Sequence, residues 1–469
     1  MDEASPPRTR PGGASREYRF AQWAGAAYLA FAILVGLADI FYIFHHYPAF
    51  PFGDRWIWLA KLYERGAWGA LWAQYNEHRL LIPGVLFLLD HRYFGSVNGL
   101  LIVASMLFQA GCVVLLILPL WRQADIPKPA RCVFGGFVVI AMFWFIQAEN
   151  FFYVFQMVLA CANLGVLATL HFFSRIAWRQ DSPGRPATWL WIAILGCAFW
   201  ATFSFGHGIL IWPALLLTGL AARLPARSLL IILVAFVCAA GLYFTGYHTP
   251  ASHASPLESL RHPLRVVQYA VLMLGLPFFG VQSQDVSLFT HFGSYALTVG
   301  GILIALAMLL RFALVQAERG NREQYVYCPT LVVSLGAVFV AALGRSNFPI
   351  DQALSGRYTH IPLLFWISLA ALVTADLSRR ERRGGLGRAV WCALLILASA
   401  ATLSTQITVG RYMALRSRYQ AAAAMSITVG VPDTIRIAEE LAAPDLVAYV
   451  DQSTKRALGH SLFARPEAA

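Results

Sequence analysis

The stretch that decides the fold is residues 21–44, AQWAGAAYLAFAILVGLADIFYIF. It contains 24 residues and a single charged side chain, Asp39. A helix of about 20 apolar residues is long enough to cross the hydrocarbon core of a bilayer. The stretch is too long for the apolar region of a cleavable signal peptide, so we expect it to remain as a membrane-spanning helix.

The composition of the whole chain points the same way. Of its 469 residues, 58% are hydrophobic and 13% are charged, whereas a soluble domain carries about 25% charged residues. This composition excludes a soluble enzyme, and it excludes a disordered chain, which needs low hydrophobicity. The formal charge is +12. Basic residues in a membrane protein report orientation first, so we expect membrane lipids and no nucleic acid as partners.

Further apolar stretches follow along the chain, and they predict an all-α polytopic membrane protein with about eleven transmembrane helices. We expect one transmembrane domain at 21–408, a disordered cytoplasmic N-terminus at 1–20 and a short extracytoplasmic tail at 409–469. The predicted spans are 21–44, 95–120, 132–147, 151–173, 188–203, 209–222, 228–247, 293–312, 326–344, 361–376 and 388–408.

The orientation follows from the basic residues. Arginines precede the first span and form a cluster at 379–383, so the positive-inside rule places the N-terminus in the cytoplasm. The basic residues stay concentrated on the cytoplasmic side only if one further apolar stretch, 264–281, does not cross the membrane. Because Gly275, Pro277 and Gly280 interrupt this stretch, we expect it to be re-entrant or to lie at the outer surface.

Polar residues gather in the loops that this topology places outside. Charged groups near membrane depth cost several kcal/mol and mark candidate functional sites. The first outer loop, 45–94, contains Asp54, a tryptophan-rich interfacial helix at 55–75 and then a short polar segment. We therefore expect the active face to point outward. The other candidate site residues in these loops are Asn76, Glu77, His78, Arg79, Glu149, Asn150, His207, Arg345, Arg357 and Tyr358.

The order of these pieces resembles the GT-C superfamily of integral-membrane glycosyltransferases. More narrowly, it resembles bacterial polytopic proteins with an Asn-Glu-His-Arg motif in the first outer loop. The matching pieces are Gly53-Asp54, Asn76-Glu77-His78-Arg79, Glu149-Asn150 with Phe155-Gln156, Gly206-His207-Gly208 with Trp212-Pro213, and Arg345 with Ser355-Gly356-Arg357-Tyr358.

The resemblance implies an enzyme of the cytoplasmic (inner) membrane that uses a sugar carried on a polyprenyl phosphate. It implies transfer to an envelope glycan or lipid acceptor on the outer side, with inversion, and Asp54 as the catalytic carboxylate. Many members pair two acidic residues in this loop, whereas Arg55 follows Asp54 here. A divalent metal, Mg²⁺ or Mn²⁺, is therefore an open expectation.

Glycosyl transfer needs a base for the acceptor hydroxyl and stabilisation of the departing phosphate. Asp54 is the candidate base, and its alternative role is the N-cap of the helix at 55–75. Glu77 is a candidate for assisting Asp54 or binding the acceptor, and its alternative is an ion pair with Arg79 or Arg55. Glu149 is the third candidate catalytic carboxylate, and its alternative role is a cap between two spans.

Guanidinium groups bind phosphate through two parallel hydrogen bonds, so Arg79, Arg345 and Arg357 are candidate donor-binding residues. His78 is a candidate for binding the phosphate or a metal, and its alternative is an interfacial hydrogen bond. Arg79 has the alternative of a snorkelling anchor, and Tyr358 that of an interfacial belt residue. We expect Asn76, Asn150, Gln156 and His207 to line the cavity, while Gln156 and His207 also suit packing between helices.

Two other functions fit the same residues. The first is a transporter or flippase for a lipid-linked glycan or another anion, which needs polar residues along a path through the membrane. The second is a membrane acyltransferase, for which His78 is the candidate catalytic residue. Because the polar residues concentrate at one end of the spans, the sequence favours the glycosyltransferase.

Overall fold

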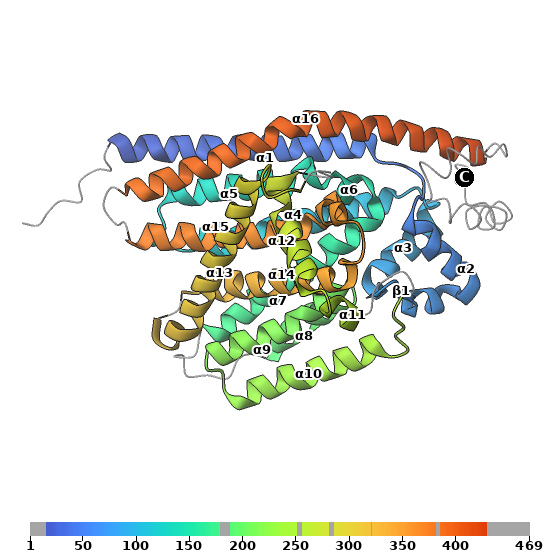
Figure 1. The fold of residues 1–469 in the computed structure, drawn as a ribbon, viewed down its shortest axis with the longest axis horizontal. Coiled ribbons are helices and arrows are strands. Elements are labelled where there is room, and N and C mark those ends of the chain that lie inside the picture. The colour runs from blue at the N-terminus through green and yellow to red at the C-terminus, as the bar shows by residue number, and fades with distance from the viewer. Residues whose placement is uncertain are drawn as a thin grey trace, which may run out of the picture.

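The computed structural model describes residues 16–178, 188–250, 256–280, 286–319, 321–380 and 385–428. Within these ranges the chain is helical apart from one short β-hairpin (Figure 1). Nine segments of this described part are long and apolar enough to span a membrane, as judged by length and composition. They are α1 (Arg16–His46), α4 (Gly99–Trp121), Lys128–Phe152 with α5 (Lys128–Met142) and α6 (Ala148–Phe152), Val154–Ala177 with α7 (Met157–Ala177), α10 (Ala226–Phe244), Phe292–Leu314 of α13 (Phe292–Arg319), α14 (Gln324–Arg345), α15 (His360–Arg380) and Leu386–Met425 of α16 (Leu386–Thr428).

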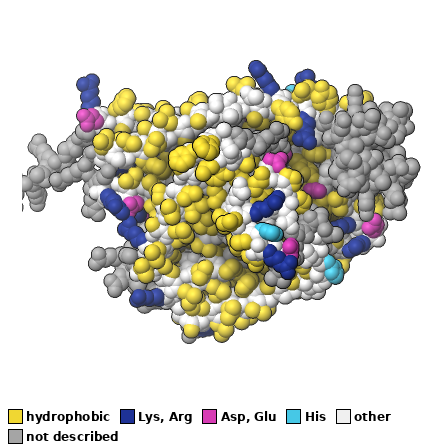
Figure 2. All heavy atoms as spheres, viewed as in Figure 1, with side chains coloured by type: hydrophobic (Ala, Val, Ile, Leu, Met, Phe, Trp, Pro, Cys, Tyr) yellow, Lys and Arg dark blue, Asp and Glu magenta, His cyan; other side chains and the backbone are white. Residues whose placement is uncertain are grey.

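The distribution of apolar side chains fits a polytopic membrane protein. The large side chains of Phe134, Phe173 and Phe365 are fully buried in α5, α7 and α15. Trp23 of α1, in contrast, is 77% exposed although it is apolar. Figure 2 shows an apolar surface across the middle of the bundle, with charged side chains mostly toward its two ends. An apolar surface of this extent is stable against lipid and not against water.

Three further apolar helices have fewer than 18 residues: α8 (Thr188–Thr202), Gly206–Ala221, which joins η3 (Gly206–Leu210) to α9 (Ile211–Ala221), and α12 (Pro263–Phe279). The expected spans 188–203 and 209–222 fall on the first two. The count of eleven therefore stays a prediction, beside nine long segments in the described part.

The doubtful stretch 264–281 corresponds to α12, which follows the short helix α11 (Pro256–Leu260). In Figure 1, α12 is steeply inclined to the nearly horizontal axes of α14 and α7. It packs against protein, because the Trp366 indole of α15 donates a 2.9 Å hydrogen bond to the Leu274 carbonyl. This arrangement agrees with the expectation that the stretch does not cross, which stays a prediction.

The two terminal helices are longer than the sequence predicted. Helix α1 begins at Arg16 within the expected N-terminal segment, and α16 continues twenty residues past the expected end of the last span. The two helices lie side by side in Figure 1, and Gln406 of α16 donates a 2.7 Å hydrogen bond to the Asp39 carboxylate of α1. The parts of the predicted terminal segments at 1–15 and 429–469 lie outside the described residues.

The first outer loop folds into a compact unit at one end of the bundle, on the right of Figure 1. It contains α2 (Asp54–Trp72), the strands β1 (Gln74–Tyr75) and β2 (His78–Arg79), and α3 (Leu81–Phe94). The helix predicted at 55–75 is thus present, with a break at Gly66, where φ is 69°. At the other end of α15, Arg379 forms ion pairs with Asp125 at 2.6 Å and Glu323 at 2.7 Å.

Candidate active site

The Asn-Glu-His-Arg segment forms a tight hairpin. Strands β1 and β2 pair antiparallel, with Tyr75 opposite His78, so Asn76 and Glu77 make the turn. Asn76 has a φ of 47°, a left-handed conformation that asparagine tolerates better than most residues. Its side chain is exposed. The asparagine thus shapes the turn that presents Glu77, and its predicted place in the cavity lining stays a prediction.

Glu77 forms an ion pair with a residue far away in the sequence. Its Oε1 lies 2.7 Å from Nη2 of Arg345, at the end of α14. Arg345 Nη1 also donates a 2.5 Å hydrogen bond to the Tyr358 hydroxyl. Glu77 thus forms an ion pair, as its alternative role proposed, but the partner described is Arg345 rather than Arg79 or Arg55. Loop residues 268 positions apart meet because the hairpin and the end of α14 lie at the same end of the bundle.

Two guanidinium groups share one aromatic ring. Tyr358 follows Arg357 in the 3-10 helix η5 (Gly356–Tyr358), which leads into α15. The Cζ atoms of Arg345 and Arg357 lie 5.3 and 5.2 Å from the centroid of the Tyr358 ring. Such distances allow cation–π attraction, which holds like charges close together. The ring thereby brings both guanidinium groups to one place, where Glu77 is the ion-pair partner of Arg345.

Arg357 differs from Arg345 in its partners. Within the part of the chain that the structure describes, its guanidinium has no carboxylate within 4 Å, and its buried Nε has no hydrogen-bond partner. Glu149 instead accepts hydrogen bonds from the Arg357 backbone N–H at 3.0 Å and from the Ser355 hydroxyl at 3.1 Å. Glu149 therefore fixes the segment that carries Arg357 and leaves the guanidinium free for an anion.

Asp54 is positioned by two tyrosines. Its backbone N–H donates to the Tyr153 hydroxyl, and the Tyr75 hydroxyl donates to its carbonyl at 3.4 Å. The N-cap of α2 is Gly53 rather than Asp54, so the alternative capping role is not observed. The carboxylate is partly buried and makes no ion pair with any described residue. Burial and the nearby Asp54 charge raise the pKa of Tyr75, which keeps its phenol protonated.

Gly53 allows this close contact. Its φ of 54° is a conformation that residues with a side chain avoid. A Cβ atom at this position would also lie 2.7 Å from the Tyr153 hydroxyl oxygen. The Gly53-Asp54 pair thus places the carboxylate beside the loop between α6 and α7.

His78 and Arg79 connect the hairpin to the bundle. His78 Nδ1 accepts a 3.2 Å hydrogen bond from the Gly206 N–H, and its Nε2 lies 3.4 Å from Glu77 Oε1. Arg79 donates to the backbone carbonyls of Tyr243 at 3.0 Å, Trp72 at 2.5 Å and Thr245. Burial lowers the pKa of Arg79. A phosphate bound by Arg79 would have to replace these carbonyls, so Arg345 and Arg357 are the better placed cations.

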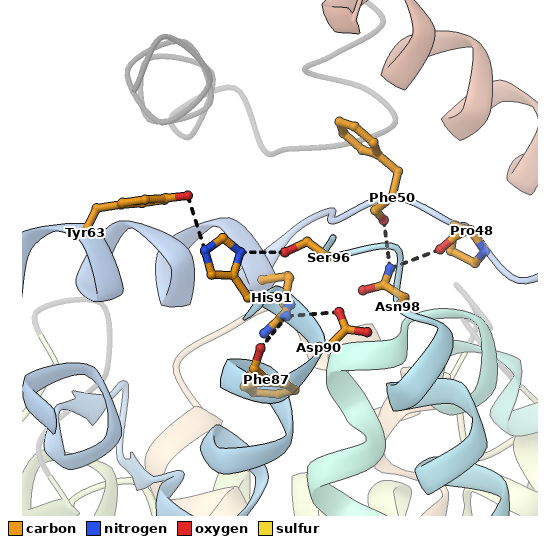
Figure 3. A network of polar contacts seen from close by, with 9 residues as sticks. Pro48, Phe50, Tyr63, Phe87, Asp90, His91, Ser96 and Asn98 are labelled. Atoms are coloured by element: carbon orange, nitrogen blue, oxygen red, sulfur yellow. Dashed lines mark hydrogen bonds and ion pairs between the residues drawn. The ribbon is translucent and has the colours of Figure 1, made fainter. Parts of the chain in front are cut away.

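Arg55 stands where many members of the resembled superfamily have a second acidic residue, and the structure shows what it does instead. It is 2% exposed and forms an ion pair at 3.3 Å with Asp90 of α3, which is fully buried (Figure 3). It also donates to the Phe87 carbonyl at 3.0 Å. In the same network, Asn98 donates to the carbonyls of Pro48 and Phe50, and this joins the chain before α2 to the start of α4. Arg55 therefore connects α2 to α3 within the loop and contacts none of the predicted site residues.

The remaining predicted residues are buried near the site. Asn150 is 3% exposed, and neither atom of its amide has a hydrogen-bond partner among the described residues. Gln156 is 7% and His207 8% exposed. His207 belongs to a hydrogen-bond network with Asn163. Their predicted place in a cavity stays a prediction.

Several tyrosines of the site escaped sequence reasoning. Tyr75 and Tyr153 carry no motif of their own, although each stands within three residues of a predicted site residue. Tyr269 belongs to α12, whose placement the sequence left open. It is fully buried, its hydroxyl has no partner among the described residues, and Arg345 and Arg357 interact with it electrostatically. Helix α12 thus contributes a phenol to the arginine site.

The described residues contain no group of three or more His, Cys, Asp or Glu side chains close enough to hold a metal ion. The expected divalent metal, Mg²⁺ or Mn²⁺, stays a prediction. Comparison with protein-family models, with curated proteins and with solved structures finds no match to this chain.

Proposed function

We propose that the protein is a GT-C-type membrane glycosyltransferase. It transfers a sugar from a polyprenyl-phosphate-linked donor to an envelope glycan or lipid acceptor on the outer side of the cytoplasmic membrane. The observation that supports this best is that the Asp54 carboxylate and the Arg357 guanidinium both lie near the Tyr153 phenol. Tyr153 interacts electrostatically with both Asp54 and Arg357, and neither group has an ion-pair partner among the described residues.

The two groups suit opposite sides of a glycosyl transfer. Asp54 accepts the proton of the acceptor hydroxyl, whose oxygen forms the new bond to the anomeric carbon from the face opposite the phosphate. The bond between that carbon and the phosphate oxygen breaks, and the polyprenyl phosphate leaves with the electron pair. Arg357 and Arg345 stabilise the negative charge that grows on the phosphate. Glu77 holds Arg345, and Glu149 holds the backbone of Arg357.

Comparative mass spectrometry of envelope lipids and glycans tests this function. The samples are cells with the intact gene, cells without it, and cells making Asp54→Asn at matched protein level. Loss of the same sugar-sized mass in the deletion and in Asp54→Asn supports glycosyl transfer. A glycan change in the deletion combined with wild-type glycans in Asp54→Asn would contradict the role of Asp54 and favour transport.

The matched control is Asp351→Asn. Asp351 is an exposed carboxylate of the 3-10 helix η4 (Ile350–Leu354), on the loop that joins α14 to α15. It lies on the same side of the bundle and carries the same charge as Asp54. It makes none of the hydrogen bonds or ion pairs described above, and its electrostatic effect on Tyr269 is the smallest of those acting on that phenol. We expect the glycans of this variant to equal those of wild type.

A further inference from the structure

Four uncharged side chains from four different elements form a continuous hydrogen-bond chain inside the bundle. His207 Nε2 of η3 lies 2.8 Å from Asn163 Oδ1 of α7. Asn163 Nδ2 lies 2.8 Å from His360 Nδ1, at the start of α15. His360 Nε2 lies 2.6 Å from Gln109 Oε1 of α4, and Gln109 Nε2 donates to the Met142 carbonyl. All four side chains are at most 8% exposed.

The last member fixes the direction of every bond in the chain. A backbone carbonyl can only accept, so the Gln109 amide must turn its nitrogen to Met142 and its oxygen to His360. His360 Nε2 therefore carries a proton and donates. If the ring is neutral, Nδ1 has a lone pair and accepts from the Asn163 nitrogen. The Asn163 oxygen then accepts from a protonated Nε2 of His207.

Both rings are neutral for a simple electrostatic reason. A buried charge without a partner is costly, and such groups give up their charge. Neither His207 nor His360 has a carboxylate within 4 Å among the described residues. Each imidazole is thus held in the tautomer with the proton on Nε2.

One acceptor remains at the end of the chain. Nδ1 of His207 is buried, carries a lone pair in this tautomer and has no partner among the described residues. The His207 ring lies 5.6 Å from the ring of Phe205, which packs 3.7 Å from His78. The neighbouring Gly206 N–H donates to His78, so His207 belongs to the segment that contacts the hairpin carrying Glu77.

We propose that this chain positions His207 Nδ1 as the acceptor for a hydroxyl group. Gln109, Asn163 and His360 are positioning residues, because they fix the tautomer through one another. The hydroxyl belongs to water in the resting protein or to a hydroxyl of the sugar or acceptor during the reaction. The second source rests on the proposed glycosyl transfer, whereas the tautomer and the first source do not.

Nitrogen NMR of the protein labelled with ¹⁵N-histidine in lipid nanodiscs tests the chain directly. The protein has 12 histidines, so the spectra of His207→Gln and His360→Gln are needed to assign the signals of these two rings. We expect both rings to be protonated at Nε2 and unprotonated at Nδ1 at neutral pH, with Nδ1 of His207 showing the shift of a hydrogen-bonded acceptor. A proton on Nδ1 of either ring, or a bare lone pair on His207, would overturn the proposal.

A variant that interrupts the hydrogen-bond chain at Asn163 provides a second NMR test. In Asn163→Leu, His207 loses the acceptor of its Nε2 proton, and we expect it to populate a mixture of tautomers. His360 keeps its proton on Nε2, because Gln109 still accepts from it. Thr330→Val is the matched control, since Thr330 is equally buried but donates only to the Val326 carbonyl of its own helix. An unchanged His207 tautomer in folded Asn163→Leu would contradict the proposed hydrogen-bond chain, and so would a mixture at His360. If that variant does not fold, the wild-type spectrum decides between the outcomes.

Two replacements of His207 distinguish water from a substrate hydroxyl. Glutamine keeps a donor at the place of Nε2 and loses the acceptor, whereas asparagine keeps an acceptor at the place of Nδ1. If the hydroxyl belongs to the substrate, His207→Gln forms the glycan product about ten-fold more slowly, as expected for one lost hydrogen bond, and His207→Asn less so. Equal product in both variants, or glycans that do not depend on the gene at all, would overturn the substrate hydroxyl. The NMR result would then stand for water alone.

Discussion

The buried ion pair between Arg55 and Asp90 gives the sharpest stability prediction. Burial lowers the pKa of Arg55 to about 10, although the neighbouring Asp90 charge acts in the opposite direction. Burial likewise raises the pKa of Asp90, against the opposing effect of Arg55. Both shifts disfavour the charged form, so desolvation outweighs the attraction between the two groups. We therefore expect the pair to cost stability when it is compared with an apolar replacement.

The size of the effect follows from these shifts. At about 1.4 kcal/mol for each pH unit, the shift of Arg55 corresponds to about 3 kcal/mol against its charged form. Asp90→Leu leaves this cation buried without a counter-charge and should destabilise the loop by about 3–5 kcal/mol. The double variant Arg55→Met with Asp90→Leu removes both charges and should be neutral or more stable by about 1–4 kcal/mol.

The single variant Arg55→Met adds a pH signature. Without Arg55, the pKa of the buried Asp90 rises further, because the lowering effect of the cation is gone. The folded loop then takes up a proton more readily than the unfolded loop does. Its stability is greatest below the ordinary pKa of 3.8 and falls as pH rises through the raised folded-state pKa. The double variant should lack this dependence.

Hydrogen exchange measured by mass spectrometry on peptides from 54–95 reports the opening free energy of this loop alone. Peptides from α7 serve as an internal reference, since they belong to the buried centre of the bundle. A double variant that is as unstable as Asp90→Leu would refute the reasoning, since it would mean that the pair contributes net stability. Hydrogen exchange of Asp90→Leu at the wild-type rate would also refute the reasoning, because the buried Arg55 cation would then tolerate the loss of its counter-charge.

Three further predictions concern the site. Gly53→Ala should destabilise the hairpin region by about 1–3 kcal/mol and lower glycan product, because φ is unfavourable and the Tyr153 hydroxyl must move; wild-type exchange in peptides around residue 53 would contradict this. Tyr358→Phe keeps the ring and removes one hydrogen bond to a guanidinium, so product should fall about ten-fold with unchanged thermal stability. A cysteine at Asn76 should react with a membrane-impermeant maleimide on intact cells, whereas a cysteine at Arg380 should react only after permeabilisation; the reverse pattern would invert the topology.

The sequence predicted the membrane class and most of the long helices because apolar length is a local property. It predicted the outer-loop helix for the same reason, and α2 lies within a residue or so of its expected start. The partner of Glu77 could not be predicted, because Arg345 is 268 positions away and no local pattern joins the two. The length of α16 was missed because its last twenty residues contain several arginines that end the apolar pattern.

The hydrogen-bond chain shows which signal sequence reasoning passed over. Gln109 and Asn163 each carry an amide in the middle of a predicted span, at 95–120 and 151–173, with apolar neighbours on both sides. An isolated amide within a span needs a partner on another helix, so its presence alone predicts an interhelical contact. What the sequence cannot tell is which helix supplies that partner, since this depends on how the spans pack. His360 and His207 answer the question only once α4, α7 and α15 are seen together.

Helix α15 connects the two ends of the molecule and relates the site to the membrane. It contains 21 residues, so at about 1.5 Å per residue it is about 31 Å long, close to the thickness of the hydrocarbon core. His360 begins this helix three residues after Arg357, and Arg379 is its last residue but one. The site and the basic cluster are thus separated by one membrane thickness along a single rigid element. If the positive-inside rule holds for Arg379 and Arg380, the site must open at the outer surface, which a lipid-borne phosphate reaches from within the bilayer.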